Sequence, residues 1–523
     1  MQRWRVAHRW QPWRALRSPT IGLVGLALVS TSLYWQGITR QYPLAKGLAG
    51  THRTWPALVD LSLRAGWTHA GVYTLLTLCY MLALRVAARV PPRQTIPAMG
   101  VVVAGWLLCS ASLLPAYPGE SLDIFDYIVR GRMQVMFGVS PLATTPDAFP
   151  DVPFYSYATW KGWVDAYGPL WEGTSGMVAR AVSVFTRSTL PDYVLGYRLL
   201  AITMAGLCGG LIVRIVGRAA PRLTVVALVT WLWNPLLLIA TALGGHNDGM
   251  MLVLMLLALL CVQREHWLLG LLMLGLAAHV KIMALLLLPA LLLGLVRRRG
   301  WRRAFGIALA TLILLLPLSW TLYEPFGGWQ TLPRMLRERA ILTYNSPANI
   351  VFDVLYRVRH WPVTPARQAA IRGSTLLFLL VAAALMLSFW WQTRTRPADD
   401  ATLWRVGIAI TMAYLLVGCF WFQEWYVMWV LVLAALLPGS TFTLRGVPLF
   451  SLGALLSNIS TEFLNQDPLR RFTPLQVDSI MVTVLWTPLL CALILPILWR
   501  VVQGRLMSGA TVQNGLHVAD PPA

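Results

Sequence analysis

The chain has 523 residues, of which 57% are apolar and only 12% are charged. Ordinary soluble domains carry about 25% charged residues, so the composition excludes that class and favours an integral membrane protein. The net charge of +22 suggests nucleic acid, but the arginines cluster in short loops between apolar runs, where the positive-inside rule places them. We therefore expect no nucleic-acid partner. The six cysteines lie in or beside apolar runs without metal-ligand spacing, so neither a disulfide framework nor a zinc site is indicated.

Apolar runs of transmembrane length recur along the chain. A spanning helix needs about 20 residues, with a range of about 17–25. The runs predict an all-α integral membrane fold with about 14 transmembrane helices, in a range of about 11–14. The expected crossings are 21–38, 69–88, 97–115, 193–213, 223–243, 248–263, 266–280, 281–297, 304–323, 372–391, 404–420, 425–438, 446–459 and 479–499.

We expect one membrane domain between two short termini. Residues 1–20 are basic and precede an apolar run without a small-residue cleavage site, which indicates a retained cytoplasmic N-terminus rather than a cleaved signal peptide. Residues 21–500 are expected to form the single transmembrane domain. Residues 501–523 are expected to be a disordered tail, which is also cytoplasmic.

Charge sets the predicted orientation in a cell membrane. Three short loops are basic and contain no acid: 85–93, 214–222 and 297–303. The positive-inside rule assigns such loops to the cytoplasm. Three larger loops are then extracytoplasmic: 116–192, 324–371 and 460–478. The first of them is expected to carry short surface helices, one near 123–134 and one near 173–187.

One boundary decides which side of the membrane the candidate residues face. Residues 266–296 can form one long helix or two short ones that meet near His279 and Lys281. One helix would put the basic loop 297–303 outside, against the positive-inside rule. We therefore predict two helices, which places Lys281 and the GGHND segment at 244–248 on the outer face.

The first outer loop begins with two acids in a segment that can form a short helix. Asp123 and Asp126 are three residues apart and share one helix face. A partly desolvated aspartate beside a membrane can have a raised pKa, which suits a general base. Both are catalytic candidates; the alternative is that one of them caps the helix.

The GGHND segment is a candidate anion site. Two glycines permit a tight turn, and Asn247 or Asp248 can cap the helix that follows. The N-terminus of that helix attracts anions such as phosphate, and His246 can donate to the same anion. The alternative is a plain helix cap with an interfacial histidine.

Two cations are candidates for a phosphate partner. Lys281 is one of only three lysines and interrupts an apolar run, where a charge is either functional or snorkels to the interface. Arg339 forms a basic patch with Arg334 and Arg337 on the predicted outer side. This patch can meet a lipid-linked phosphate, or it is a solvated amphipathic face.

The segment at 421–429 is rich in aromatic residues. An aromatic belt at the membrane interface is its default explanation, but aromatic faces also stack on sugars. Gln423, Trp425 and Tyr426 are therefore candidates for a substrate wall. Tyr127 and Tyr167, in the first outer loop, are the other candidates, although the segment after Tyr167 is most simply a turn.

Five segments resemble, in order, motifs of polytopic GT-C glycosyltransferases: DIFDYIVRGRMQVMFGVSPL, AYGPL, NPLLLIATALGGHNDGMM, HVKIMALLLLP and QEWYVMW. The similar enzymes are polyprenol-phosphate-mannose-dependent mannosyltransferases and their bacterial relatives. The resemblance implies that Asp123 is the catalytic base. It also implies that His246, Asp248 and Lys281 lie near the donor phosphate.

Three positions depart from the pattern of these enzymes. Asp126 stands where relatives often have arginine, Ala240 where they often have an acid, and Leu142 where they often have tyrosine. Because of these departures, the resemblance does not define the acceptor, the fine geometry of the site or the catalytic role of Asp126.

Together these features predict an inverting glycosyltransferase. It would move a sugar, with mannose preferred, from a polyprenyl-phosphate donor to an extracytoplasmic hydroxyl of a glycan, glycolipid or protein. The alternatives are a transporter or flippase of lipid-linked saccharide, and an oligosaccharide ligase or polymerase. No cofactor is expected, and the residue pattern leaves a divalent metal open. Membrane lipid is the further expected partner.

Overall fold

The chain is helical throughout the part that the computed structural model describes, which comprises residues 18–49, 63–395, 398–465 and 471–513. Within these residues the only strand-like pairings are two isolated bridges, Pro43 with Ala116 and Tyr344 with Trp421. The predicted all-α fold class is therefore confirmed. The predicted cytoplasmic segment 1–20 lies almost entirely outside the described residues.

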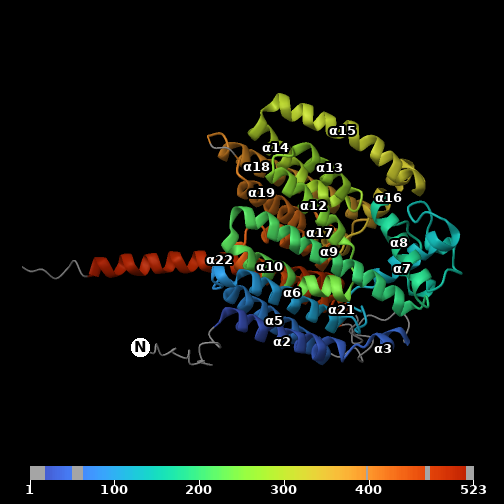
Figure 1. The fold of residues 1–523 in the computed structure, drawn as a ribbon, viewed down its shortest axis with the longest axis horizontal. Helices are drawn as coiled ribbons and strands as arrows, with labels where there is room; N and C mark the ends of the chain where they lie inside the picture. Colours follow the sequence, from blue (N-terminus) through green and yellow to red (C-terminus); the bar gives the residue numbers. More distant parts are fainter. Residues whose placement is uncertain (1–17, 50–62, 396–397, 466–470, 514–523) are drawn as a thin grey trace, which may run out of the picture.

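Short connections join most of the helices, as Figure 1 shows. The first half contains α2 (Pro19–Tyr34), α3 (Leu44–Ala49), α5 (Leu63–Ala87), α6 (Thr95–Leu113), α7 (Asp123–Phe137), α8 (Pro169–Phe185), α9 (Leu190–Ala219), α10 (Thr224–Leu232), α11 (Pro235–Leu238) and α12 (Asp248–Gln263). The second half contains α13 (Trp267–Ala278), α14 (Leu288–Arg299), α15 (Trp301–Tyr323), α16 (Leu332–Arg339), α17 (Pro347–Asp353), α18 (Val363–Gln392), α19 (Asp400–Ala413), α20 (Val427–Ala434), α21 (Val447–Asn465) and α22 (Pro474–Gln513). Short irregular turns of helix include η6 (Ile239–Leu243), η7 (Ile282–Leu287), η11 (Tyr414–Gly418) and η12 (Glu424–Tyr426).

Nine helices of the described part are long and apolar enough to cross a membrane, and each coincides with a predicted crossing. They are Pro19–Thr39, Gly66–Ala87, Pro92–Leu113, Leu190–Ala219, Trp301–Phe326, Val363–Gln392, Asp400–Gly418, Phe442–Ser460 and Pro474–Ile494. The crossing predicted at 223–243 is a pair of helices bent by 51°, and the break lies at Pro235, which has no backbone N–H to continue the helix. Three of the other four predicted crossings coincide with shorter apolar helices, and the crossing at 281–297 coincides with η7 and α14. The total of about 14 spans therefore stays a prediction.

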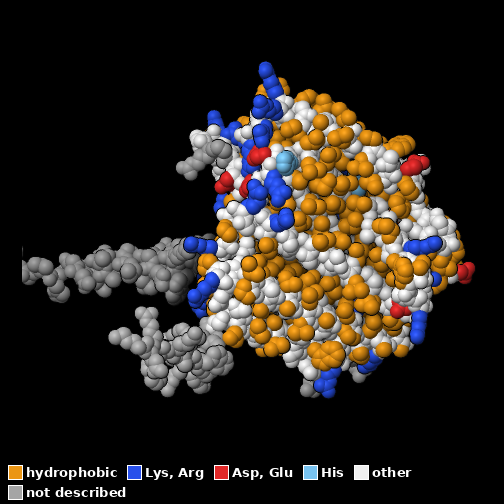
Figure 2. All heavy atoms as spheres, in the orientation of Figure 1, with side chains coloured by type: hydrophobic (Ala, Val, Ile, Leu, Met, Phe, Trp, Pro, Cys, Tyr) orange, Lys and Arg blue, Asp and Glu red, His pale blue; other side chains and the backbone are white. Residues whose placement is uncertain are grey.

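Burial separates central helices from outer ones. Every residue of α10 and α20 is buried, as expected for helices that are apolar all round. Few residues of α15 and α18 are buried, so these two helices present apolar side chains outwards. Figure 2 shows apolar side chains over the middle of the molecule, with most charged side chains towards its two ends. This distribution is typical of a protein embedded in a bilayer.

The predicted break near Lys281 is confirmed. Helix α13 ends at Ala278, and α14 begins only after Lys281, whose backbone is extended, and the short η7 turn. The first outer loop docks on this break through its backbone. Gly168 N–H donates to the carbonyl of Val280 at 3.0 Å, and Leu170 N–H donates to the carbonyl of His279 at 3.1 Å. The loop and the Lys281 turn are therefore held as one unit.

The two surface helices are confirmed as α7 and α8. Helix α7 ends at Gly138, which has the left-handed backbone (φ 65°) of a C-terminal cap. The C-terminal tail differs from expectation. Helix α22 extends to Gln513, so residues 501–513 of the predicted disordered tail are helical.

Replacing Gly168 with alanine is expected to disrupt the docking of the loop. The added Cβ would lie 2.1 Å from the carbonyl oxygen of His279, and backbone atoms cannot give way easily. Overpacking of this kind costs about 1–3 kcal/mol, so the thermal midpoint in detergent should fall clearly. Gly210→Ala is the control, because its Cβ would meet nothing within 4 Å. An unchanged midpoint for Gly168→Ala would contradict the docking.

Candidate active site

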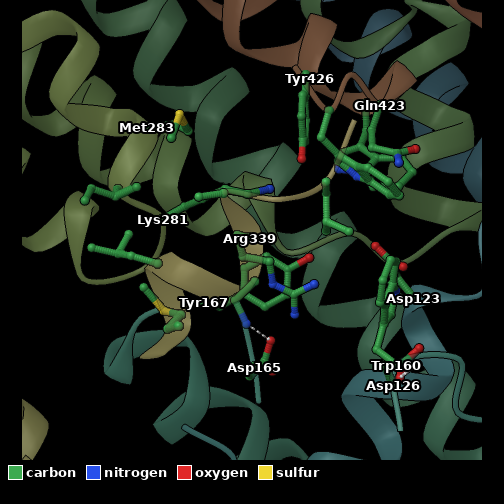
Figure 3. A pocket seen from close by; sticks show the side chains of 18 of the residues that line it. Asp123, Asp126, Trp160, Asp165, Tyr167, Lys281, Met283, Arg339, Gln423 and Tyr426 are labelled. Carbon is green, nitrogen blue, oxygen red and sulfur yellow. Dashed lines mark hydrogen bonds between the residues drawn. The ribbon is translucent and has the colours of Figure 1, made fainter. Parts of the chain in front are cut away.

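A cavity of about 430 Å³ lies between the first outer loop, the Lys281 turn, α16 and the segment before α20. Its volume is that of an ordinary small-molecule site, about 300–1,000 Å³. All but two of the predicted site residues line it: Asp123, Asp126, Tyr127, Tyr167, Lys281, Arg339, Gln423, Trp425 and Tyr426. Figure 3 shows this cavity from close by. The two residues that do not line it are His246 and Asp248.

Asp123 is the first residue of α7 and faces the cavity. Removal from water and the neighbouring Asp126 raise the pKa of its carboxyl, and Lys281, Arg339 and the Trp160 side chain lower it. The net result is a pKa of about 7. An aspartate with such a pKa can accept a proton near neutral pH, which is what a general base requires.

Asp126 lines the same cavity, but both of its oxygens are engaged. Oδ2 accepts from the backbone N–H of Thr159 at 3.1 Å and Oδ1 from that of Trp160 at 2.9 Å. Burial raises its pKa to about 6, although Arg130 and these N–H groups lower it. The geometry therefore gives Asp126 an anchoring role for the 159–160 loop. The alternative of a capping carboxylate is also wrong, because neither Asp123 nor Asp126 caps α7.

Lys281 reaches the cavity from an ion pair with Asp248. Its Nζ lies 2.9 and 3.0 Å from the two carboxylate oxygens of Asp248, which also accepts from Trp429 Nε1 at 2.6 Å. The ammonium group lies 5.0–5.5 Å from the ring centroids of Tyr167, Tyr426 and Trp429. This cage of aromatic rings holds the positive charge at the wall of the cavity.

Asp248 holds Lys281 from behind the cavity wall. Its side chain is fully buried and does not line the cavity, so it positions Lys281. The predicted place of this helix end near the donor phosphate stays a prediction. The capping alternative is wrong, since neither Asn247 nor Asp248 caps α12 with its side chain.

His246 is separated from the cavity by Trp425. The two rings are stacked with centroids 3.7 Å apart. Gly245 takes a left-handed backbone (φ 66°), and this turn carries His246 behind the cavity wall. Burial lowers the pKa of His246 well below its usual value, so the ring is neutral. It fixes the plane of Trp425 and offers no charge to a phosphate.

Arg339 ends α16 and reaches over the first outer loop. Its Nη2 donates to the carbonyl of Val164 at 3.0 Å, and its guanidinium lies over the rings of Trp160 and Trp163 at 5.3 and 5.7 Å. The neighbouring Glu338 accepts from Val164 N–H at 3.1 Å. These contacts hold α16 across the cavity and keep a second cation in its lining.

Two of the predicted wall residues, Tyr167 and Tyr426, lie on opposite sides of Lys281. The hydroxyl groups of Tyr127 and Tyr167 are hydrogen bonded at 3.0 Å. Tyr426 stacks on Trp429 with centroids 4.3 Å apart. The wall therefore combines aromatic faces with a pair of hydroxyl groups, which suits a ligand that is polar at its edges and apolar on its faces.

Sequence reasoning missed a second group of buried charges, of which Arg130 and Asp165 line the cavity. Arg130 donates from Nη2 to the carbonyls of Trp160 and Trp163, both at 3.0 Å, and its Nε lies 3.6 Å from Asp165. Glu172 is fully buried nearby. Its pKa is raised well above the usual value, mainly by burial and also by the neighbouring Asp165. Arg130 lies four residues after Asp126 on α7, so the helix spacing was the available signal.

The cavity has an apolar side that reaches the molecular surface. Ile282, Met283, Met335, Leu336 and Leu342 line it. The side chains of Ile282 and Leu336 are 41% and 43% exposed. An apolar tail can therefore leave the cavity sideways between η7 and α16. Within the described ranges, no group of three or more His, Cys, Asp or Glu residues is arranged to hold a metal ion.

Replacing Asp248 with asparagine is expected to destabilise the protein, because Lys281 would keep its charge without a partner. Breaking a buried pair costs about 3–5 kcal/mol, so the midpoint of unfolding should fall. Adding Lys281→Met should recover most of the loss. Arg299→Gln removes an exposed pair with Glu265 and should cost less than about 1 kcal/mol. Full stability of Asp248→Asn alone would contradict the assigned role.

Comparison with known proteins agrees with this geometry. Residues 19–297 match the family model described as alpha-(1->6)-mannopyranosyltransferase, N-terminal domain, and residues 180–418 match that of glycosyltransferase family 87. The chain is 27% identical over 434 residues to alpha-(1->6)-mannopyranosyltransferase A of Mycobacterium tuberculosis, covering 79% of both chains. It is 26% identical over 178 residues to alpha-(1->6)-mannopyranosyltransferase A of Corynebacterium glutamicum, covering 34% of this chain and 35% of that one. These matches confirm the GT-C resemblance, and because the first family model spans more than half of the chain, the protein belongs to the alpha-(1->6)-mannopyranosyltransferase family.

Proposed function

We propose that this membrane glycosyltransferase moves mannose, with inversion, from a polyprenyl-phosphate donor to an acceptor hydroxyl. The names of the two relatives support the sugar and an α-(1→6) linkage. The observation that carries the mechanism is that Asp123, Lys281 and Arg339 line one cavity. This combines a base for the acceptor with cations for the leaving phosphate.

In the proposed step, Asp123 removes the proton from the acceptor hydroxyl as its oxygen attacks the anomeric carbon of the donor sugar. The bond between that carbon and the phosphate oxygen breaks, and the phosphate leaves with the electron pair. Lys281 and Arg339 stabilise the charge that develops on it. Electrostatic stabilisation of this kind is usually the largest catalytic contribution. A single displacement from one face of the sugar inverts the anomeric centre.

The apolar side of the cavity supports a lipid-linked donor. Ile282 and Leu336 line an apolar opening and are exposed at the molecular surface. A water-soluble sugar phosphate has no apolar group that would occupy such an opening. A polyprenyl tail can lie in this opening and remain among the bilayer lipids. The phosphate would then lie beside the Lys281 ammonium, which the rings of Tyr167 and Tyr426 flank.

The distribution of arginine supports an extracytoplasmic site with both termini in the cytoplasm. Residues 282–299, made of η7 and α14, connect the Lys281 turn to the RRRGWRR loop. The positive-inside rule assigns that basic loop to the cytoplasm. The cavity, which lies at the other end of this segment, would then face the opposite side of the membrane.

Asp123→Asn is expected to reduce transfer from mannosyl-phosphoryl-polyprenol by about 10²–10⁴-fold, the contribution of a general base. Purified wild type and variant, reconstituted in lipid vesicles, are assayed with a panel of polyprenyl-phosphate sugars. Asp151→Asn is the matched control, since Asp151 is an exposed aspartate of the same loop. If Asp123→Asn transfers at the wild-type rate, Asp123 is not the base.

Transfer should also depend on pH through Asp123. The pKa of this group is raised to about 7, so the carboxyl is protonated and inactive as a base below that value. We expect kcat/KM to rise about tenfold per pH unit below pH 7 and to level off above it. The profile is measured from about pH 5 to 9 with Asp151→Asn as the control. A flat profile across pH 7 would be inconsistent with this base.

A further inference from the structure

Two tryptophans that the proposed step does not use meet at the cavity. Trp160 comes from the first outer loop and Trp421 from the segment after η11, and both line the cavity. Their ring centroids are 5.7 Å apart with an interplanar angle of 70°. Both side chains are partly exposed, whereas most tryptophans that pack the core are buried. The pair therefore forms an open corner in the cavity wall.

Backbone contacts fix each of these rings in place. Trp421 is paired with Tyr344 in an isolated parallel bridge: Tyr344 N–H donates to Phe420 O at 2.8 Å and Phe422 N–H donates to Tyr344 O at 3.0 Å. The Tyr344 ring also lies 5.1 Å from the Trp421 ring. The backbone of Trp160 is held by Asp126 at its N–H and by Arg130 at its carbonyl. A mobile interfacial belt has no need of such support, whereas a binding site gains from rigid walls.

The corner lies on the base side of the cavity. The Trp160 side chain is one of the groups that lower the pKa of Asp123, and its backbone N–H is bonded to Asp126, three residues after Asp123 on α7. In the view of Figure 3, Asp123 and Trp160 lie on one side of Arg339, and Lys281 and Met283 lie on the other. The Lys281 side continues into the apolar opening proposed for the donor lipid. The substrate that meets the tryptophan corner is therefore the acceptor.

The chemistry of the corner fits a carbohydrate. A pyranose ring has an apolar C–H face, which packs on an indole, and hydroxyl groups at its edge. Gln423 lines the cavity two residues after Trp421, and its amide can hydrogen-bond to hydroxyls. Aromatic surface with a few placed polar groups is typical of specific small-molecule recognition.

We propose that Trp160 and Trp421 form an acceptor subsite for a saccharide chain of at least two sugar units. The terminal unit lies against Trp160 with its hydroxyl at Asp123, and the next unit stacks on Trp421. Arg339 lies over the Trp160 ring and the Tyr344 ring lies against Trp421, so each sugar unit would contact the part of the ring that remains exposed. The two rings are set at 70° to each other, so the two units would have different orientations. This inference rests on the proposed function, because it takes Asp123 as the group that meets the acceptor. It adds which side chains of the cavity meet the acceptor.

The binding test uses Asp123→Asn protein in detergent, with no donor present, so that binding is read without turnover. The probes are mannose, α-(1→6)-linked mannobiose and α-(1→6)-linked mannotetraose. Their binding is measured by saturation-transfer NMR and titration calorimetry. We expect both oligosaccharides to bind more tightly than mannose. Adding Trp421→Ala should weaken oligosaccharide binding by about tenfold, as for a central aromatic contact, and leave mannose unchanged. Trp421→Phe keeps a ring and should restore most of the affinity, which separates loss of stacking from misfolding.

A kinetic test in the otherwise unchanged enzyme distinguishes acceptor from donor contacts. Trp421→Ala should raise KM for mannotetraose by about tenfold and leave KM for the donor within about twofold. Trp391→Ala is the control, because Trp391 is 63% exposed at the C-terminal end of α18 and does not line the cavity. An increase in the donor KM would assign the corner to the lipid and overturn the proposal, as would equal binding of all three probes. Failure of Asp123 as the base would leave the binding result intact, so the two proposals fail separately.

Discussion

The ion pair between Lys281 and Asp248 is the interaction on which the site depends. A lysine at membrane level is costly unless a partner compensates its charge, and Asp248 provides that partner with both oxygens at about 3 Å. The pair joins the start of α12 to the turn between α13 and η7, and Trp429 Nε1 ties both to α20. Because Gly168 docks on the same turn, the first outer loop is positioned by the same contact. A cation is thereby held at a fixed place in the cavity wall, facing the loop that carries Asp123.

Four aspartates near the cavity have different roles because they have different partners. Asp126 accepts two backbone N–H groups, Asp165 pairs with Arg130, and Asp248 pairs with Lys281. Asp123 is the aspartate of this group that combines a place in the cavity with a pKa raised to about 7. In the proposed mechanism, Asp123 is the least compensated of the four carboxylates and acts as the base, and the three others shape the walls.

The sequence predicted the membrane fold and most of the cavity, since both depend on local signals. Apolar runs predicted the crossings, and arginine-rich loops predicted the break at Lys281. The order of the motifs predicted that Asp123 and Lys281 belong to one site. It did not predict the roles of His246 and Asp248, because these depend on which side of a tight turn each side chain takes. The Gly245 turn sends His246 behind Trp425, and Asp248 is turned towards Lys281. Such contacts between distant segments leave no periodic pattern to read.

The central claim is that one bound donor meets Lys281 with its phosphate and the side chain of residue 123 with its sugar. The most direct measurement is a cryo-electron microscopy structure of Asp123→Asn in lipid nanodiscs with mannosyl-phosphoryl-polyprenol. The account predicts phosphate density within hydrogen-bond distance of Lys281 Nζ, a lipid tail between η7 and α16, and the anomeric carbon facing residue 123. Phosphate density elsewhere in the protein, with the Lys281–Asp248 pair undisturbed and the cavity empty, would contradict it.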